Sequence, residues 1–104
     1  MTHEKVPDIQ QMRLAAEKAC STLRTLAHQD RLLLLCQISQ GERSVSELEE
    51  LLDFHQPSLS QQLGVLRTEG LVTTRRDGKR IYYSVTDPNV LSLLTKLYEL
   101  YCPA

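Results

Sequence analysis

The stretch between residues 44 and 85 constrains the fold more than any other part of the chain, because its helix and turn signals follow one another in a recognisable order. Ser44 with Glu47 three residues later forms a capping box, which predicts the start of a helix. Gln56-Pro57 predicts the start of a second helix, since proline is tolerated in the first turn. Two short helices joined by a turn are therefore expected here.

A hairpin is expected directly after these helices. The second helix should end at Gly70, and two strands should follow, Leu71–Arg76 and Lys79–Val85. They are joined by Asp77-Gly78, a dipeptide that supplies the positive φ of a two-residue turn. Helix, turn, helix and hairpin predict a winged helix-turn-helix, a mainly α fold with a small β-hairpin. That shape fits the major groove of DNA, which indicates a DNA-binding regulator.

The remaining chain predicts three more helices within one domain, residues 1–104. Asp8 can cap a first helix that runs to about Leu26. Asp30 can cap a second one that runs through Ser39, and apolar residues on nearly all its sides predict that it is buried. Asp87-Pro88 predicts the start of a last helix.

The first and last of these helices carry more apolar surface than such a small core can cover. A two-fold homodimer would bury the excess and would place two recognition helices about one DNA turn apart. The alternative, that both helices only cover their own core, stays open at this point.

Polar side chains gather on the second helix of the 44–85 stretch. Its leucines share one face, and the candidate DNA-reading residues lie around the other side: Gln56, Ser58, Ser60, Gln61 and Gln62. A glutamine amide can bond bidentately to adenine, and a serine hydroxyl can reach a base edge or a phosphate. The alternative is a helix surface that is polar only because it faces solvent.

Positive charge is concentrated in the same region. The whole chain has a net charge of −1, but residues 56–85 carry five Lys/Arg against two Asp/Glu, whereas residues 1–55 carry six against nine. Four cations surround the hairpin turn: Arg75, Arg76, Lys79 and Arg80. A positive wing would bind the phosphate backbone with a strong dependence on salt, although a basic hairpin can also serve only to protect a sheet edge.

Composition and residue spacing indicate the compartment of the protein and whether it holds disulfides, metals or cofactors. No apolar run approaches the roughly 18 residues that a membrane span needs, so a cytoplasmic protein without a membrane partner is expected. Three cysteines in a reducing compartment do not predict a disulfide framework. The histidines His3, His28 and His55 lack metal-ligand spacing, and neither a metal site nor a cofactor is expected.

The whole chain resembles the ArsR/SmtB family of small dimeric winged-helix repressors. The likeness covers roughly residues 10–102 and is carried by four segments: LRTLAHQDRLLLLCQIS (23–39), SVSELEELL (44–52), QPSLSQQLGVLRTEGLV (56–72) and RRDGKRIYYSV (75–85). The resemblance implies a dimer built by the first and last helices, an operator DNA partner and an inducer that releases the DNA.

The cysteines distinguish among inducers within this resemblance. Arsenic-sensing members carry a Cys-x-Cys where this chain has residues 46–50, which contain no cysteine, and the histidine ligands of zinc-sensing members are missing from the last helix. Cys36 and Cys102, 66 residues apart, look like the pair of the persulfide- and sulfide-responsive subgroup (the BigR, SqrR and HlyU type). The resemblance implies that reactive sulfur species link the two thiols and that the protein then leaves its operator.

Three alternatives stay open. Cys20 could join the other two cysteines in a thiolate site for a soft ion such as As(III), Cd(II) or Zn(II), although a plain packing role on the first helix is also expected of it. A winged helix can serve protein contacts alone. A thiol enzyme is disfavoured, because the sequence has no cofactor-pocket signature.

Overall fold

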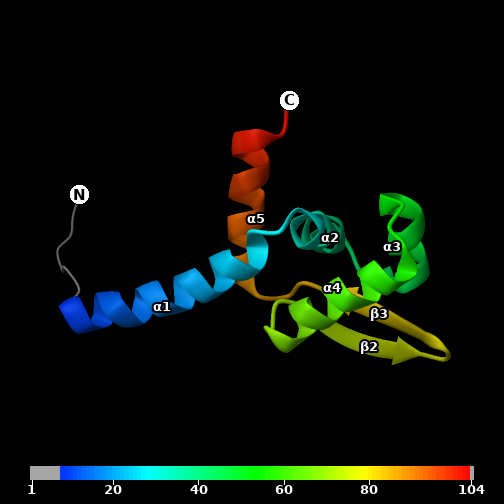
Figure 1. Cartoon of the computed structure of the whole chain (residues 1–104), viewed down its shortest axis with the longest axis horizontal. Coiled ribbons are helices and arrows are strands. Elements are labelled where there is room, and N and C mark those ends of the chain that lie inside the picture. The colour runs from blue at the N-terminus through cyan, green and yellow to red at the C-terminus, as the bar shows by residue number, and fades with distance from the viewer. Residues whose placement is uncertain (1–7, 104) are drawn as a thin grey trace.

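The computed structural model describes residues 8–103, apart from the side chain of Gln56. The elements follow one another as α1 (Ile9–Leu26), α2 (Gln29–Ser39), β1 (Arg43–Ser44), α3 (Val45–Leu52), α4 (Gln56–Thr68), β2 (Thr73–Asp77), β3 (Arg80–Ser84) and α5 (Pro88–Tyr101) (Figure 1). The predicted mainly α winged helix-turn-helix is confirmed.

Local capping signals place the helix starts. Asp8 caps α1 and Ser44 caps α3, as predicted, and both caps form reciprocal capping boxes, which the sequence predicted for Ser44 only. The cap of α2 differs from the prediction, because His28 holds that position and its Nδ1 accepts from the Arg31 N–H at 3.5 Å. Asp30 lies instead in the first turn, where its carboxylate faces the positive end of the helix dipole.

The hairpin turn lies one residue further along than predicted. Asp77 still pairs with Arg80 across the strands, so the two turn residues are Gly78 and Lys79. Gly78 has φ 66°, whereas Lys79 is not among the residues with positive φ. Glycine at the first central position is typical of a type II′ turn, which suits the twist of a hairpin.

Strand β1 has no counterpart in the sequence prediction. Its two residues pair with Tyr82 and Tyr83 of β3, which gives an antiparallel sheet in the order β1-β3-β2. Two residues are too few to show the alternation that identifies a strand. The sheet therefore ties the start of α3 to the wing, a link that only the folded chain reveals.

The core lies between α2, α3 and α4. Their fully buried side chains are Leu34, Leu35, Ile38, Leu48, Leu59, Leu63 and Leu66. Each such side chain contributes roughly 1.5–3 kcal/mol through removal of its surface from water. Helix α2 supplies three of them, so its predicted central position is confirmed.

Helices α1 and α5 extend away from this core (Figure 1). Only Thr25 and Leu26, at its end, are buried in α1, and large apolar side chains stay exposed on both helices: Ile9, Met12, Leu14, Leu23, Tyr98, Leu100 and Tyr101. The predicted excess of apolar surface is thus present in the single chain. None of the helices between residues 8 and 103 is long and apolar enough to span a membrane.

Candidate DNA-reading face and dithiol site

Helix α4 presents one polar face outside the core. Ser60 and Gln61 are exposed and Ser58 is half-buried, as the predicted reading face requires. The side chain of Gln56 lies outside the described residues. After the C-cap, Gly70 adopts φ 78°, and the Leu71 N–H donates to a carbonyl of the last turn at 2.9 Å. This Schellman motif turns the chain sharply from α4 toward the wing.

Gln62 does not share that exposed face. Its side chain is only 9% exposed, and its Oε1 accepts from Arg31 Nη1 at 3.1 Å. The physical reason is helix geometry, since Gln62 follows Leu59 by three residues and precedes Leu66 by four. The spacing of the leucines could have revealed that Gln62 faces inward, but the amide of Gln62 favoured its interpretation as a DNA-reading residue.

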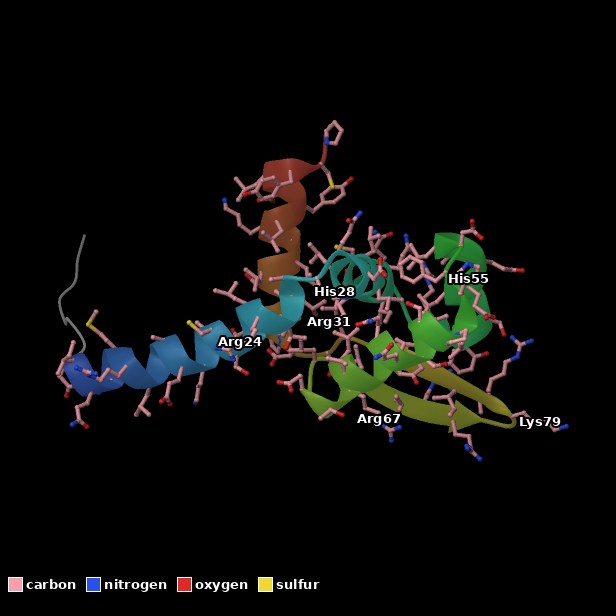
Figure 2. All side chains as sticks on the ribbon, viewed as in Figure 1. Arg24, His28, Arg31, His55, Arg67 and Lys79 are labelled. Atoms are coloured by element: carbon pink, nitrogen blue, oxygen red, sulfur yellow. The ribbon has the colours of Figure 1, made fainter. Side chains whose placement is uncertain are left out.

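The wing carries four exposed cations, and three of them form no ion pair within residues 8–103. Arg76, Lys79 and Arg80 are exposed around the β2–β3 turn, and Lys79 lies at its tip (Figure 2). A pocket of about 180 Å³ lies where the wing meets α3, and its lining includes Ser46, Lys79 and Arg80. Cations beside the N-terminus of a helix favour an anion such as a backbone phosphate.

Arg75 is held differently from these three cations. Its Nε and Nη2 donate to the two carboxylate oxygens of Glu42 at 2.7 and 2.8 Å, and its guanidinium lies 4.7 Å from the centroid of the Tyr82 ring. The hydrogen bonds from Arg75 lower the pKa of the Glu42 carboxyl. Arg75 therefore links the wing to the loop before β1, and its guanidinium is less available to bind a phosphate.

The structure brings the two predicted sensor cysteines to one pocket. Cys36 is half-buried on α2, and Cys102 is exposed directly after α5. Both line a pocket of about 290 Å³, whose other lining residues are Gln29, Leu32, Leu33, Leu97, Tyr98 and Tyr101. The lining is almost wholly apolar, so this pocket suits a neutral thiol better than a metal-bound thiolate.

The two thiols differ in their surroundings. Burial, and secondarily the nearby Cys102, raises the pKa of Cys36 above its ordinary value of 9.0. At neutral pH Cys36 is therefore almost entirely the thiol, which is a poor nucleophile. Cys102 is exposed, so a reagent in solution reaches it without displacing any core residue.

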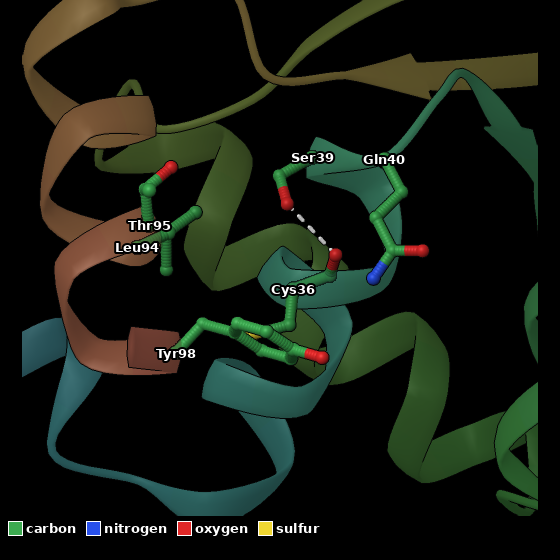
Figure 3. A pocket seen from close by; sticks show the side chains of 6 residues that line it. All are labelled: Cys36, Ser39, Gln40, Leu94, Thr95 and Tyr98. Carbon is green, nitrogen blue, oxygen red and sulfur yellow. Dashed lines mark hydrogen bonds between the residues drawn. The ribbon is translucent and has the colours of Figure 1, made fainter. Parts of the chain in front are cut away.

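A second cavity, of about 420 Å³, also borders Cys36, and Cys102 is not among its lining residues (Figure 3). Its lining is more polar and includes Ser39, Gln40 and Thr95. The Ser39 hydroxyl donates to the Cys36 carbonyl at 2.8 Å (Figure 3). Cys36 and Tyr98 thus belong to the walls of both cavities.

Cys20 is not brought to the other two cysteines. It is exposed on α1, in a shallow surface groove between Arg13, Glu17 and Arg24. Among residues 8–103 no group of three or more Cys, His, Asp or Glu side chains lies close enough to hold a metal ion. The packing role on the first helix that the sequence suggests for Cys20 is not fulfilled within one chain.

Comparisons with known proteins identify relatives of this chain in sequence and in fold. A family model described as "Bacterial regulatory protein, arsR family" matches residues 28–74. The chain is 47% identical to the biofilm growth-associated repressor of Agrobacterium fabrum over 95% of this chain and 89% of the relative. It is similar to the solved structure of the transcriptional repressor BigR from Xylella fastidiosa, with TM-score 0.85, 42% identity, and coverage of 94% of this chain and 100% of that one. Reduced HlyU from Vibrio cholerae gives TM-score 0.86 at 36% identity, over 91% and 100% of the two chains.

Proposed function

The chain belongs to the ArsR family of bacterial regulatory proteins, and on that basis we propose that it is a homodimeric, dithiol-controlled repressor of transcription. The family is one of DNA-binding regulators, which supports the expectation that the chain is not an enzyme. The observation that carries the control by thiols is the shared pocket of Cys36 and Cys102.

The reduced dimer binds double-stranded operator DNA. Ser58, Ser60 and Gln61 on α4 meet base edges in the major groove, and the start of α4 at Gln56 lies near a phosphate. The wing cations Arg76, Lys79 and Arg80 follow the backbone, and Arg75 holds the wing in place through Glu42. Gln62 leaves the predicted reading set, because its amide is turned inward.

The dimer forms through α1 and α5. Their exposed apolar residues would otherwise stay in contact with water at a cost of roughly 25 cal/mol per Å². Leu23→Glu, which puts a charge on this surface, is expected to raise the dimer dissociation constant by about tenfold or more in sedimentation experiments. Gln10→Glu adds the same charge at a polar position of α1, and equal weakening by both variants would contradict this interface.

A persulfide, R–S–SH, is the proposed inducer. The Cys102 thiolate attacks the outer sulfur, the S–S bond of the persulfide breaks, and R–S⁻ leaves and takes a proton. Cys36 then gives up its proton and attacks the Cys102 sulfur, and hydrosulfide leaves. The net reaction converts two thiols and one persulfide into a disulfide, one thiol R–SH and one H₂S. If both cysteines first become persulfides, their condensation yields a trisulfide and H₂S.

Linking the cysteines changes the relation of two helices. Cys36 belongs to α2 at the centre of the core, and Cys102 ends α5, which belongs to the proposed dimer interface. A covalent bridge would draw the end of α5 toward α2 and alter the spacing of the two α4 helices in the dimer. Reactive sulfur in the reducing cytoplasm would thereby lower operator affinity.

The test is the intact mass of the reduced protein after treatment with glutathione persulfide, with hydrogen peroxide and oxidised glutathione as comparison reagents. We expect a bridged product only with persulfide, together with loss of DNA binding in fluorescence anisotropy. Cys36→Ala and Cys102→Ser should keep DNA affinity and lose the response, whereas Cys20→Ser should keep both. Full release of DNA by Cys36→Ala or by Cys102→Ser on persulfide treatment would refute the mechanism. Stoichiometric As(III) or Cd(II) binding with loss of DNA affinity would favour the metal alternative instead.

A further inference from the structure

Arg31 joins three helices that have separate tasks in the proposed function. It lies in the first turn of α2, and its Nε donates to the Thr25 carbonyl in the last turn of α1 at 2.7 Å. Its Nη1 donates to Gln62 Oε1 on α4 at 3.1 Å. Figure 2 shows Arg31 where the end of α1 meets the body of the protein.

Both acceptors are buried groups that need a partner. The Thr25 carbonyl belongs to the last turn of α1, whose carbonyls lack intrahelical donors, and Thr25 is only 7% exposed. Gln62 sits among the leucines of α4 with its amide withdrawn from water. A buried amide oxygen without a donor costs roughly 1–3 kcal/mol, so the guanidinium favours one arrangement of α1 and α4 over others.

We propose that Arg31 is a positioning residue that fixes the recognition helix α4 relative to the dimer helix α1 and the dithiol helix α2. This inference rests on the proposed function, because it concerns how α4 is held for DNA. In a dimer built through α1, the angle between α1 and α4 sets the separation of the two recognition helices. Cys36 lies on the same rigid helix as Arg31, so a shift of α2 on sulfur bridging reaches α4 through Gln62.

A positioning role differs measurably from a direct phosphate contact. Loss of a phosphate contact weakens binding to all duplexes alike and lowers the salt slope by about 0.9. Loss of correct positioning weakens binding to the preferred duplex far more than to others and leaves the salt slope unchanged. It also differs from simple stabilisation, because a merely stabilising residue leaves the affinity of the folded fraction intact.

The experiment uses the full-length reduced chain and two duplexes, one selected by the wild-type chain from a random pool and one of scrambled sequence. Arg31→Met should lower affinity for the selected duplex roughly tenfold, with a much smaller change for the scrambled one and no change in salt slope. Arg24→Met, on the exposed side of α1, removes the same charge without these hydrogen bonds and should preserve the ratio of the two affinities.

A double variant separates positioning from stability. Arg31→Met combined with Gln62→Leu replaces both partners of the Arg31–Gln62 hydrogen bond by apolar groups of similar shape. This should recover the part of the thermal stability that the unpaired Gln62 amide costs, although the Thr25 carbonyl still lacks its donor. The preference for the selected duplex should stay reduced. A double variant with the wild-type preference would overturn the inference, and so would an equal loss on both duplexes with a lower salt slope. Failure of the wild-type chain to select any duplex would overturn the proposed function together with it.

Discussion

The proposed DNA-reading region and the proposed sensor region of this molecule are built in different ways. The reading region, α3, α4 and the wing, is held by fully buried leucines and by a two-pronged ion pair between Arg75 and Glu42. The proposed sensor region consists of α1 and α5, which extend from the core with apolar side chains exposed, and of the two thiols of Cys36 on α2 and Cys102 after α5. The core of the reading region is thus complete within one chain, whereas α1 and α5 leave apolar surface that the proposed dimer would bury.

The largest expected difference concerns stability within the reading region. Leu63→Ala leaves a cavity in a fully buried site and should lower the free energy of unfolding by about 2–5 kcal/mol. Leu51→Ala removes the same atoms from an exposed position on α3 and should change it by less than about 0.5 kcal/mol. Urea unfolding followed by circular dichroism measures both. Similar losses of unfolding free energy in the two variants would mean that Leu51, which is exposed in the single chain, is buried in the assembled protein.

A smaller difference is expected among the wing cations. Lys79→Ala removes a free cation at the tip, so DNA affinity should fall for all sequences and the salt slope should decrease by about 0.9. Glu42→Gln should release Arg75 from its carboxylate and raise non-specific affinity, because the guanidinium then becomes available to phosphate. Anisotropy titrations over a series of salt concentrations give both quantities. A Glu42→Gln variant with unchanged affinity would show that the ion pair with Glu42 does not keep Arg75 from binding phosphate.

The smallest expected effect is on the pH dependence of Cys36. Because burial raises its pKa above 9.0, alkylation of Cys36 by iodoacetamide should still be accelerating as the pH rises past 9. Cys102→Ser removes the secondary cause alone, so the pKa of Cys36 should move only partly back toward 9.0. Peptide mass spectrometry over a pH series resolves the site. A complete return to 9.0 in this variant would mean that burial is not the main cause.

The same raised pKa has a defined consequence for stability. The folded state favours the neutral thiol of Cys36, so its contribution is fully present below pH 9.0 and is lost as the pH rises through the higher folded pKa. The ion pair of Glu42 behaves in the opposite way. The pKa of this carboxyl is lowered in the folded state, so its contribution is present above 4.5 and declines as the pH falls through the folded value.

Much of the reading region could be predicted because its signals are local. The capping box of Ser44, the proline after Gln56 and the glycine after α4 act on neighbouring backbone groups, so their spacing in the sequence is sufficient. The cap at His28 was missed because an aspartate two residues later offers the commoner capping side chain. Strand β1 was missed because its two residues acquire their conformation only by pairing with β3.

The sequence by itself determined the order of elements, the apolar excess of α1 and α5, and the positive charge of the wing, because these follow from residue spacing and composition along the chain. Only the tertiary structure decided which polar side chains are engaged by other residues and which are available for DNA. Gln62 and Arg75 look like their neighbours in sequence, but Arg31 and Glu42, distant along the chain, engage them. The meeting of Cys36 and Cys102 in one apolar pocket likewise depends on how α5 packs against α2, a contact between segments that no local pattern records.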